Sequence, residues 1–231
     1  MIFKNREEAG HRLAASLQQY RNCQHGMILA LPRGGVAVGY AMSRDLHLPL
    51  DVFITRKIGV PDNPEYALGA VSETGNIYVN LEAASLYGLS YQQIEEFARV
   101  EREEIRRRQQ LYRRRRPAQP LKDRIILLVD DGIATGATFF ASVEAIRRQH
   151  PRLLVGAIPV GPADIVDRAK EVVDDLVVLA IPDGFLSVGT HYGEFGQVSD
   201  HEVVNYLHAA GHGMSGGMPE QESRHNRLVQ K

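Results

Sequence analysis

The stretch ILLVDDGIATGAT, residues 126–138, decides how this chain is interpreted. Its first four residues are apolar and match the composition of a short buried strand. Two carboxylates, Asp130 and Asp131, follow the strand, and a loop rich in glycine, alanine and threonine comes directly after them. Such a loop ahead of a helix suits a phosphate, so the two negative charges at its entrance need an explanation of their own.

The loop and the acids suit two parts of one ligand. Small side chains let backbone N–H groups approach a phosphate, the hydroxyls of Thr135 and Thr138 add donors, and a helix starting near Thr138 adds its positive end. Carboxylates accept hydrogen bonds, and a sugar diol donates two. Ligands of open α/β sheets bind at the carboxyl edge of the strands. We therefore expect a ribose 5′-phosphate at this edge, with its 2′- and 3′-hydroxyls at Asp130 and Asp131.

The rest of the chain alternates strands with helices. This order predicts an α/β fold with a central, mostly parallel sheet flanked by helices. An N-terminal helix, capped by Asn5, precedes the first strand. The predicted strands are 27–31, 50–55, 124–130, 152–160 and 175–182, and the predicted helices are 6–20, 36–46, 138–150, 162–172 and 199–211.

Two segments depart from the alternation. Residues 58–80 contain prolines and glycines, and we expect a long functional loop there with one short strand, NIYVN, at its end. Residues 90–116 predict a charged helix that begins at Ser90, inside a helical insertion at 82–120. Its expected apolar stripe is thin and consists of Ile94, Phe97, Val100 (or Glu101), Ile105 and Leu111.

Composition limits the class of protein. The chain has 231 residues and one cysteine, which excludes an internal disulfide and a CxxC zinc site, and its net charge of −1 gives no overall attraction to nucleic acid. No apolar run reaches the length of a membrane span, and charges interrupt the N-terminus where a secretion signal needs an apolar core. We expect a soluble cytoplasmic protein with one domain at 1–211 and a disordered polar tail at 212–231.

The stretch 126–138 resembles the phosphoribosyl pyrophosphate (PRPP) motif of the type I phosphoribosyltransferases. Four hydrophobic residues, two acids and the Gly/Thr loop agree in order and spacing, and the resemblance extends over most of residues 25–200. It implies the type I phosphoribosyltransferase fold, with Asp130 and Asp131 on the ribose. It also implies a loop that binds the 5′-phosphate through Gly132, Ala134, Thr135, Gly136, Ala137 and Thr138.

The segment LPRGG, residues 31–35, resembles the pyrophosphate loop of the same family. The resemblance implies that Arg33 and the N–H groups of Gly34 and Gly35 hold the diphosphate. Arg56 and Lys57 stand where family members often carry a cation beside it, and Arg33 and Lys57 are the expected catalytic residues. Residues 58–80 resemble in position the flexible loop that closes over the site.

The segment IPDGFLSVG, residues 181–189, resembles the start of the hood that covers the acceptor, about 181–198, and it makes Phe185 the acceptor-binding candidate. Ala134 stands where the 6-oxopurine enzymes carry an aspartate, which argues against hypoxanthine or guanine. Alanine there resembles the adenine enzyme, but the other base-site residues give no firm match. The chain is most similar to a group of bacterial predicted phosphoribosyltransferases whose acceptor is generally undefined.

The implied reaction displaces pyrophosphate from C1 of PRPP with a nitrogen nucleophile, such as a nucleobase in nucleotide salvage. Mg²⁺ is expected to arrive with PRPP and to lie near Asp130 and Asp131, with no metal ligands of the protein's own. No general base is identifiable, because Glu65 and Glu73 in the 58–80 segment could equally be solvated. Family members are commonly dimers, so the resemblance allows a homodimer, but the sequence leaves the oligomeric state open.

Two other functions remain open from the sequence. The first is a PRPP-sensing regulator that binds nucleic acid through the arginines of residues 99–116, although neighbouring glutamates make a solvated helix the preferred interpretation. The second is a catalytically silent module whose helical insertion docks a partner. A salt-dependent gel shift tests the first, and release of pyrophosphate from PRPP tests the second.

Overall fold

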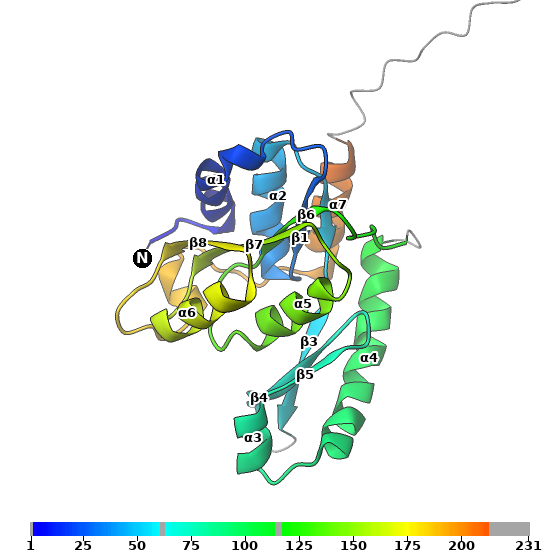
Figure 1. The fold of residues 1–231 in the computed structure, drawn as a ribbon. Coiled ribbons are helices and arrows are strands. Elements are labelled where there is room, and N and C mark those ends of the chain that lie inside the picture. Colours follow the sequence, from blue (N-terminus) through cyan, green and yellow to red (C-terminus); the bar gives the residue numbers. More distant parts are fainter. Residues whose placement is uncertain (1, 61–62, 114–116, 213–231) are drawn as a thin grey trace, which may run out of the picture.

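A five-stranded parallel sheet forms the centre of the computed structural model of this chain, which describes residues 2–60, 63–113 and 117–212 (Figure 1). Every pairing within this sheet is parallel, which confirms the predicted α/β fold. In spatial order the strands are β2 (Leu50–Val52), β1 (Gly26–Ala30), β6 (Ile125–Val129), β7 (Leu153–Val160) and β8 (Asp175–Ala180).

Helices cover both faces of this sheet, and alternate residues of each strand supply the two cores. Ile28 and Leu127 pack with α1 and α2, whereas Leu29 and Leu128 pack with α5 and α6 (Figure 1). All residues of β1 are buried, as expected for a central parallel strand. The helices are α1 (Arg6–Ser16), α2 (Gly34–Leu46), α5 (Ala137–Arg147), α6 (Ala163–Val172) and α7 (Asp200–His212), with short 3₁₀ turns η1 (Gln18–Tyr20) and η2 (Val188–His191).

Side-chain caps define two helix starts that the sequence predicted. Asn5 accepts a hydrogen bond at 3.0 Å from the backbone N–H of Glu8 and begins α1. Ser199 and Glu202 bond each other's backbone N–H groups, at 3.2 and 2.7 Å, and begin α7. Both arrangements satisfy N–H groups that have no partner inside a helix.

The segment 58–80 is not the long loop that we expected. A second, antiparallel sheet forms from β3 (Thr55–Val60), β4 (Asn63–Ser72) and β5 (Ile77–Val79), and the predicted strand 50–55 is divided between the two sheets. Gly69, which suggested a loop, lies within β4, and a Cβ there would lie 2.1 Å from the carbonyl oxygen of Tyr78 on β5. Glycine therefore permits close strand pairing here. The short strand predicted in NIYVN is confirmed as β5.

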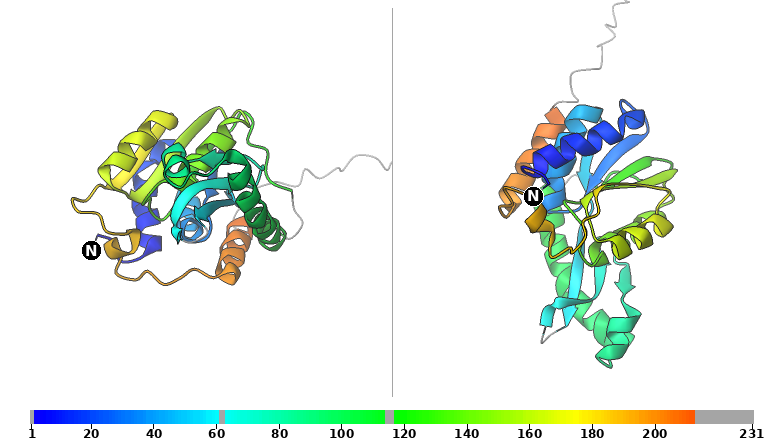
Figure 2. Two further views of the ribbon diagram at one scale, coloured as in Figure 1. Left: turned by 90° about the horizontal axis from the view of Figure 1, so that it is seen from below. Right: turned by 90° about the vertical axis from the view of Figure 1, so that its left-hand side faces the viewer.

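The predicted helices of the insertion are α3 (Leu81–Leu86) and α4 (Tyr91–Arg113), and they cover the second sheet. Ser90 and Gln93 form a capping box at the start of α4, which confirms Ser90 as its N-cap. The second sheet, α3 and most of α4 project together from the five-stranded sheet (Figures 1 and 2).

The apolar stripe expected on α4 is only partly correct. Ile94 and Ile105 are buried, but Val100 is 67% exposed and Leu111 is 38% exposed. The buried face also includes Ala98, Arg108, Tyr112 and Arg113. Spacings of three, four and seven residues put the set from Ile94 to Tyr112 on one side of the helix, with Arg113 next to it, and long arginine side chains can line such a face with their apolar stems.

Among residues 2–60, 63–113 and 117–212, no helix combines the length and apolar composition that crossing a membrane requires. The predicted tail, 212–231, lies outside the described residues except for the backbone of His212, which ends α7.

Candidate active site

The loops named by the sequence meet at the carboxyl edge of the five-stranded sheet. Because β1 and β6 are parallel neighbours, the PRGG segment and the acid pair leave the sheet side by side. The N–H of Leu31 donates to the carbonyl of Val129 at 2.8 Å, and the N–H of Ile133 donates to that of Val160 at 2.9 Å. The hood segment follows β8 at the same edge. The carboxyl edge of the sheet therefore collects the pyrophosphate-loop, ribose, phosphate and hood candidates, and this group of segments is named the cleft.

The two acids have different environments. Asp130 accepts the backbone N–H of Asp131 at 2.8 Å, and loss of solvent, followed by the charge of the Asp131 carboxylate, raises the pKa of Asp130 well above its ordinary value. Asp131 instead forms an ion pair, in which its Oδ2 lies 2.7 Å from Nε of Arg6. The hydroxyl of Tyr192 donates to the backbone carbonyl of Asp131 at 2.6 Å.

Arg6 is the residue of this site that the sequence did not reveal. Besides Asp131, it donates from Nη1 to the carbonyl of Gly196 at 2.8 Å, and its guanidinium lies 3.8 Å from the ring centre of Phe195. A cation in the first turn of a helix opposes the helix dipole, so the local sequence gives no reason for an arginine there. That mismatch is the one signal that could have pointed to a distant carboxylate.

The small-residue loop leads directly into α5. Gly136 has φ +73°, and a Cβ there would lie 2.3 Å from the ring of Phe140, so both conformation and space favour glycine. The first N–H groups of α5 face the same edge as the acids, an arrangement that favours an anion. The residues predicted to bind the phosphate differ in burial. Ala134 and Thr135 are exposed, Gly132 and Thr138 are half-buried, and Gly136 and Ala137 are buried.

The PRGG segment touches the acid pair. A Cβ on Gly34 would lie 1.8 Å from Oδ2 of Asp131, so this approach requires glycine. The N–H of Gly35 already donates to the carbonyl of Leu31 at 3.1 Å, which leaves the Gly34 amide as the better diphosphate donor of the two. Arg33 follows a cis peptide bond, and its Nη1 lies 3.8 Å from Asp200 at the start of α7.

The two cationic side chains of β3, Arg56 and Lys57, lie on opposite faces of the strand. Nε of Arg56 lies 2.7 Å from Oε2 of Glu101 on α4. Thr55 faces the other way, and its hydroxyl bonds that of Ser142 on α5 at 2.7 Å. Side chains of a strand alternate, so Lys57 shares the face of Thr55, which is the face toward α5 and the phosphate loop. Of this pair, Lys57 is therefore the residue directed toward the α5 side.

Phe185 packs within the hood. Its ring stacks on His191 at 5.4 Å between centres, and His191 Nε2 is buried without a hydrogen-bond partner among the described residues. The sequence allowed Glu73 to be solvated, but the structure buries its side chain. Its side chain is 5% exposed, accepts the N–H of Ile54 at 3.0 Å and pairs with Arg113 at 2.8 Å, whereas the side chain of Glu65 lies outside the described residues.

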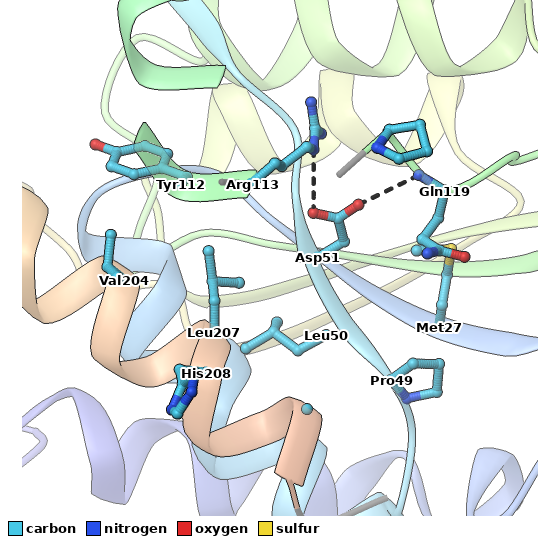
Figure 3. Close-up of a pocket in the computed structure, with 12 residues that line it drawn as sticks. Met27, Pro49, Leu50, Asp51, Tyr112, Arg113, Gln119, Val204, Leu207 and His208 are labelled. Carbon is cyan, nitrogen blue, oxygen red and sulfur yellow. Dashed lines mark hydrogen bonds and ion pairs between the residues drawn. The ribbon is translucent and has the colours of Figure 1, made fainter. Parts of the chain in front are cut away.

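A cavity of about 460 Å³ lies away from this cleft. Met27 and Pro49, at the opposite edge of the sheet from the acid pair, line it together with Leu207 and His208 of α7. Figure 3 shows Arg113 and Gln119 bonded to Asp51 in its wall. Its position separates it from the residues that the PRPP motif brings together.

The model of the phosphoribosyl transferase domain family matches residues 2–175 of this chain. The chain belongs to the phosphoribosyltransferase family. The match confirms the resemblance drawn from residues 126–138, and it includes PRGG, the acid pair and the phosphate loop.

Relatives of this phosphoribosyltransferase-family chain agree. It is 41% identical over 209 residues to a Mycobacterium tuberculosis protein, found in strains CDC 1551 and H37Rv, that is provisionally described as a phosphoribosyl transferase. That alignment covers 90% of this chain but 47% of the relative, so the chain spans about half the length of the curated relatives it matches. The crystal structure of TT1426 from Thermus thermophilus is 39% identical, with a TM-score of 0.75, over 90% of this chain and 98% of that chain.

Proposed function

We propose that this chain transfers the 5-phosphoribosyl group of PRPP to a nitrogen nucleophile, such as a nucleobase or a related amine. The observation that carries the proposal is the contact between Gly34 and Asp131, which puts a diphosphate candidate loop against a ribose candidate acid. The phosphate loop follows the same acid pair directly in the chain. The three segments would then bind the diphosphate, the ribose and the 5′-phosphate of PRPP in turn.

The ribose would lie at the acid pair. Asp130 and Asp131 would accept its hydroxyls, and their negative charge would favour the positive charge that develops at C1 as the diphosphate leaves. The N–H groups at the start of α5, with Thr135 and Thr138, would hold the 5′-phosphate. Binding at both ends of the sugar would fix C1 in the orientation that an acceptor needs.

The diphosphate would lie at the PRGG segment. Arg33, 29% exposed, and the Gly34 amide would hold its oxygens, and Lys57 would approach from β3. Mg²⁺ binds oxygen ligands, so it would be held by the oxygens of PRPP, with the carboxylates of Asp130 and Asp131 nearby. When bound, the ion would neutralise part of the charge on the leaving diphosphate.

The acceptor would bind under the hood, next to Ala134 and Phe185. Ala134 is exposed and offers no carboxylate to a purine ring, which supports an acceptor other than hypoxanthine or guanine. Phe185 already stacks on His191, so an aromatic acceptor would meet a preformed pair of rings.

Mass spectrometry tests this function. The protein is incubated with PRPP, Mg²⁺ and a pool of nucleobases and amines, and we expect one pool member to gain one phosphoribosyl group. The D130N/D131N variant should lose PRPP binding in calorimetry, whereas D167N, an exposed aspartate on α6, should retain it. Undetectable PRPP binding by the unmodified protein, or unchanged binding by D130N/D131N, would overturn the proposal.

Nucleic-acid binding is less well supported than transfer. Apart from the exposed Arg106, the described arginines of α4 pair with acids of the same chain, including Arg102 with Glu95 at 2.6 Å and Arg107 with Asp200 at 2.7 Å. Arg113 is buried in a further ion pair. Arginines held in this way are poorly placed to contact a phosphate backbone.

A further inference from the structure

Arg6 lies where three parts of the cleft meet. Its side chain is 12% exposed and is held by Asp131, by the carbonyl of Gly196 and by the ring of Phe195. A Cβ on Gly34 would also lie 3.1 Å from its Nε. One guanidinium therefore contacts the acid pair, the hood and the PRGG segment together.

The backbone around Arg6 is fixed to the hood. The N–H groups of Ile2 and Phe3 donate to the carbonyl of His191 at 2.9 and 3.0 Å, and the N–H of Gly193 donates to Phe3 at 2.8 Å. Asn5 then begins α1. Because the chain is held on both sides of residue 6, the guanidinium has a defined position rather than a range of exposed rotamers.

The ion pair engages one oxygen of Asp131. Arg6 bonds Oδ2, and among the described residues no N–H group donates to Oδ1. The side chain of Asp130 also interacts with that of Asp131, which helps to raise the pKa of Asp130. The carboxylate of Asp131 is thus oriented by Arg6, with the carboxyl group of Asp130 as its other neighbour. A ribose hydroxyl could donate to Oδ1 while Arg6 remains in place.

Charge supports the same role. Two adjacent carboxylates repel each other and the anionic PRPP, and Arg6 is the cation that pairs with one of them. A guanidinium suits this task because its planar set of donors can bond a carboxylate and a carbonyl at once. A lysine would offer a single point of charge without that geometry.

We propose that Arg6 is the positioning residue of the ribose site: it holds Asp131 by Oδ2 so that Oδ1 receives a hydroxyl of the sugar. The inference rests on the proposed function, since it assumes that PRPP binds in this cleft. Arg6 itself contacts no reacting atom in this arrangement.

Two ligands separate positioning from general damage to the cleft. PRPP contains the ribose, whereas inorganic pyrophosphate probes only the diphosphate site. In calorimetry with Mg²⁺, R6Q should weaken PRPP binding about ten- to a hundredfold, the range of a charge-assisted hydrogen bond. Its affinity for pyrophosphate should change by less than about threefold, and R6K should recover part of the PRPP affinity.

Arg12, also on α1 and paired with Glu8, provides the matched control, and R12Q should bind both ligands normally. Unchanged PRPP affinity in R6Q, or equal weakening of both ligands, would overturn the inference. If R6Q does not fold, the affinities of R6K for PRPP and pyrophosphate are measured instead. Equal weakening of both affinities would again contradict the inference. Failure of the unmodified protein to bind PRPP would instead overturn the proposed function.

Discussion

At the residue scale, Asp130 and Asp131 show how different neighbours give two identical side chains different electrostatic properties. Asp131 has a cation at 2.7 Å, whereas partial loss of solvent and a neighbouring carboxylate raise the pKa of Asp130. A carboxyl group with a raised pKa binds its proton more tightly in the folded protein than in the unfolded chain. Its contribution to stability is present below pH 3.8, the ordinary value, and is lost as the pH rises through the folded-state pKa.

Asp130→Asn should therefore stabilise the protein at neutral pH while removing function. Asparagine keeps the acceptor for the N–H of Asp131 and removes the poorly solvated charge. We expect the free energy of unfolding at pH 7.5 to rise by about 0.5–2 kcal/mol, which is the gain that a single stabilising substitution commonly gives at the cost of function. Urea titrations at several pH values should show this gain shrinking as the pH falls toward 3.8. A less stable variant, or a gain independent of pH, would contradict the assignment.

At the element scale, the last residue of α4 helps to join the projecting sheet to the rest of the molecule. Arg113 is 7% exposed and donates to the carbonyl of Val52 at 2.6 Å, and it pairs with Glu73 at 2.8 Å and with Asp51 at 3.3 Å. Burial raises the pKa of Glu73, and Arg113 works in the opposite direction. Through these contacts, Arg113 connects α4 with β2 and with Glu73, the residue that follows β4.

Arg113→Met should destabilise the protein by about 3–5 kcal/mol, because it leaves two carboxylates buried without their cation. Arg99, which is 75% exposed and pairs with Glu96 on the same helix, is the matched control, and R99Q should cost no more than about 1 kcal/mol. Urea unfolding measures both values. The double variant R113M/E73Q should recover part of the loss, and no recovery would show that packing rather than charge explains the effect.

At the scale of the whole molecule, the two edges of the parallel sheet have different surroundings. The carboxyl edge carries the cleft built from the PRGG, acid-pair and hood segments, and the opposite edge carries the cavity beside Met27 and Pro49. A ligand in the cleft should therefore change one edge and leave the other unchanged. Amide hydrogen exchange reports both edges in one experiment.

Addition of PRPP and Mg²⁺ should slow exchange in residues 31–36, 130–139 and 188–198, and removal of the ligand should reverse the change. Residues 204–211, at the cavity, should exchange at the same rate with and without ligand. Slowed exchange confined to residues 204–211 would place the ligand in the cavity and contradict the proposed cleft.

Local patterns in the sequence were enough for much of this architecture. Apolar runs of strand length, helix caps at Asn5 and Ser90, and the alternation of elements predicted the parallel sheet, and they put the candidate site at its carboxyl edge. These features depend on residues a few positions apart, so sequence order carries them. The second sheet was missed because glycine and proline mark loops on average, whereas Gly69 serves close pairing with Tyr78.

The sequence by itself determined the central fold class, the family and a set of PRPP-site candidates, because short-range periodicity and one motif encode them. Only the tertiary structure decided which charges meet. Arg6 and Asp131 are 125 residues apart in the chain, and Arg113 and Glu73 are 40 apart. It likewise decided that Arg56 pairs with Glu101 on α4. The physical reason is that an ion pair depends on distance in space, which the packing of distant elements sets and no local pattern records.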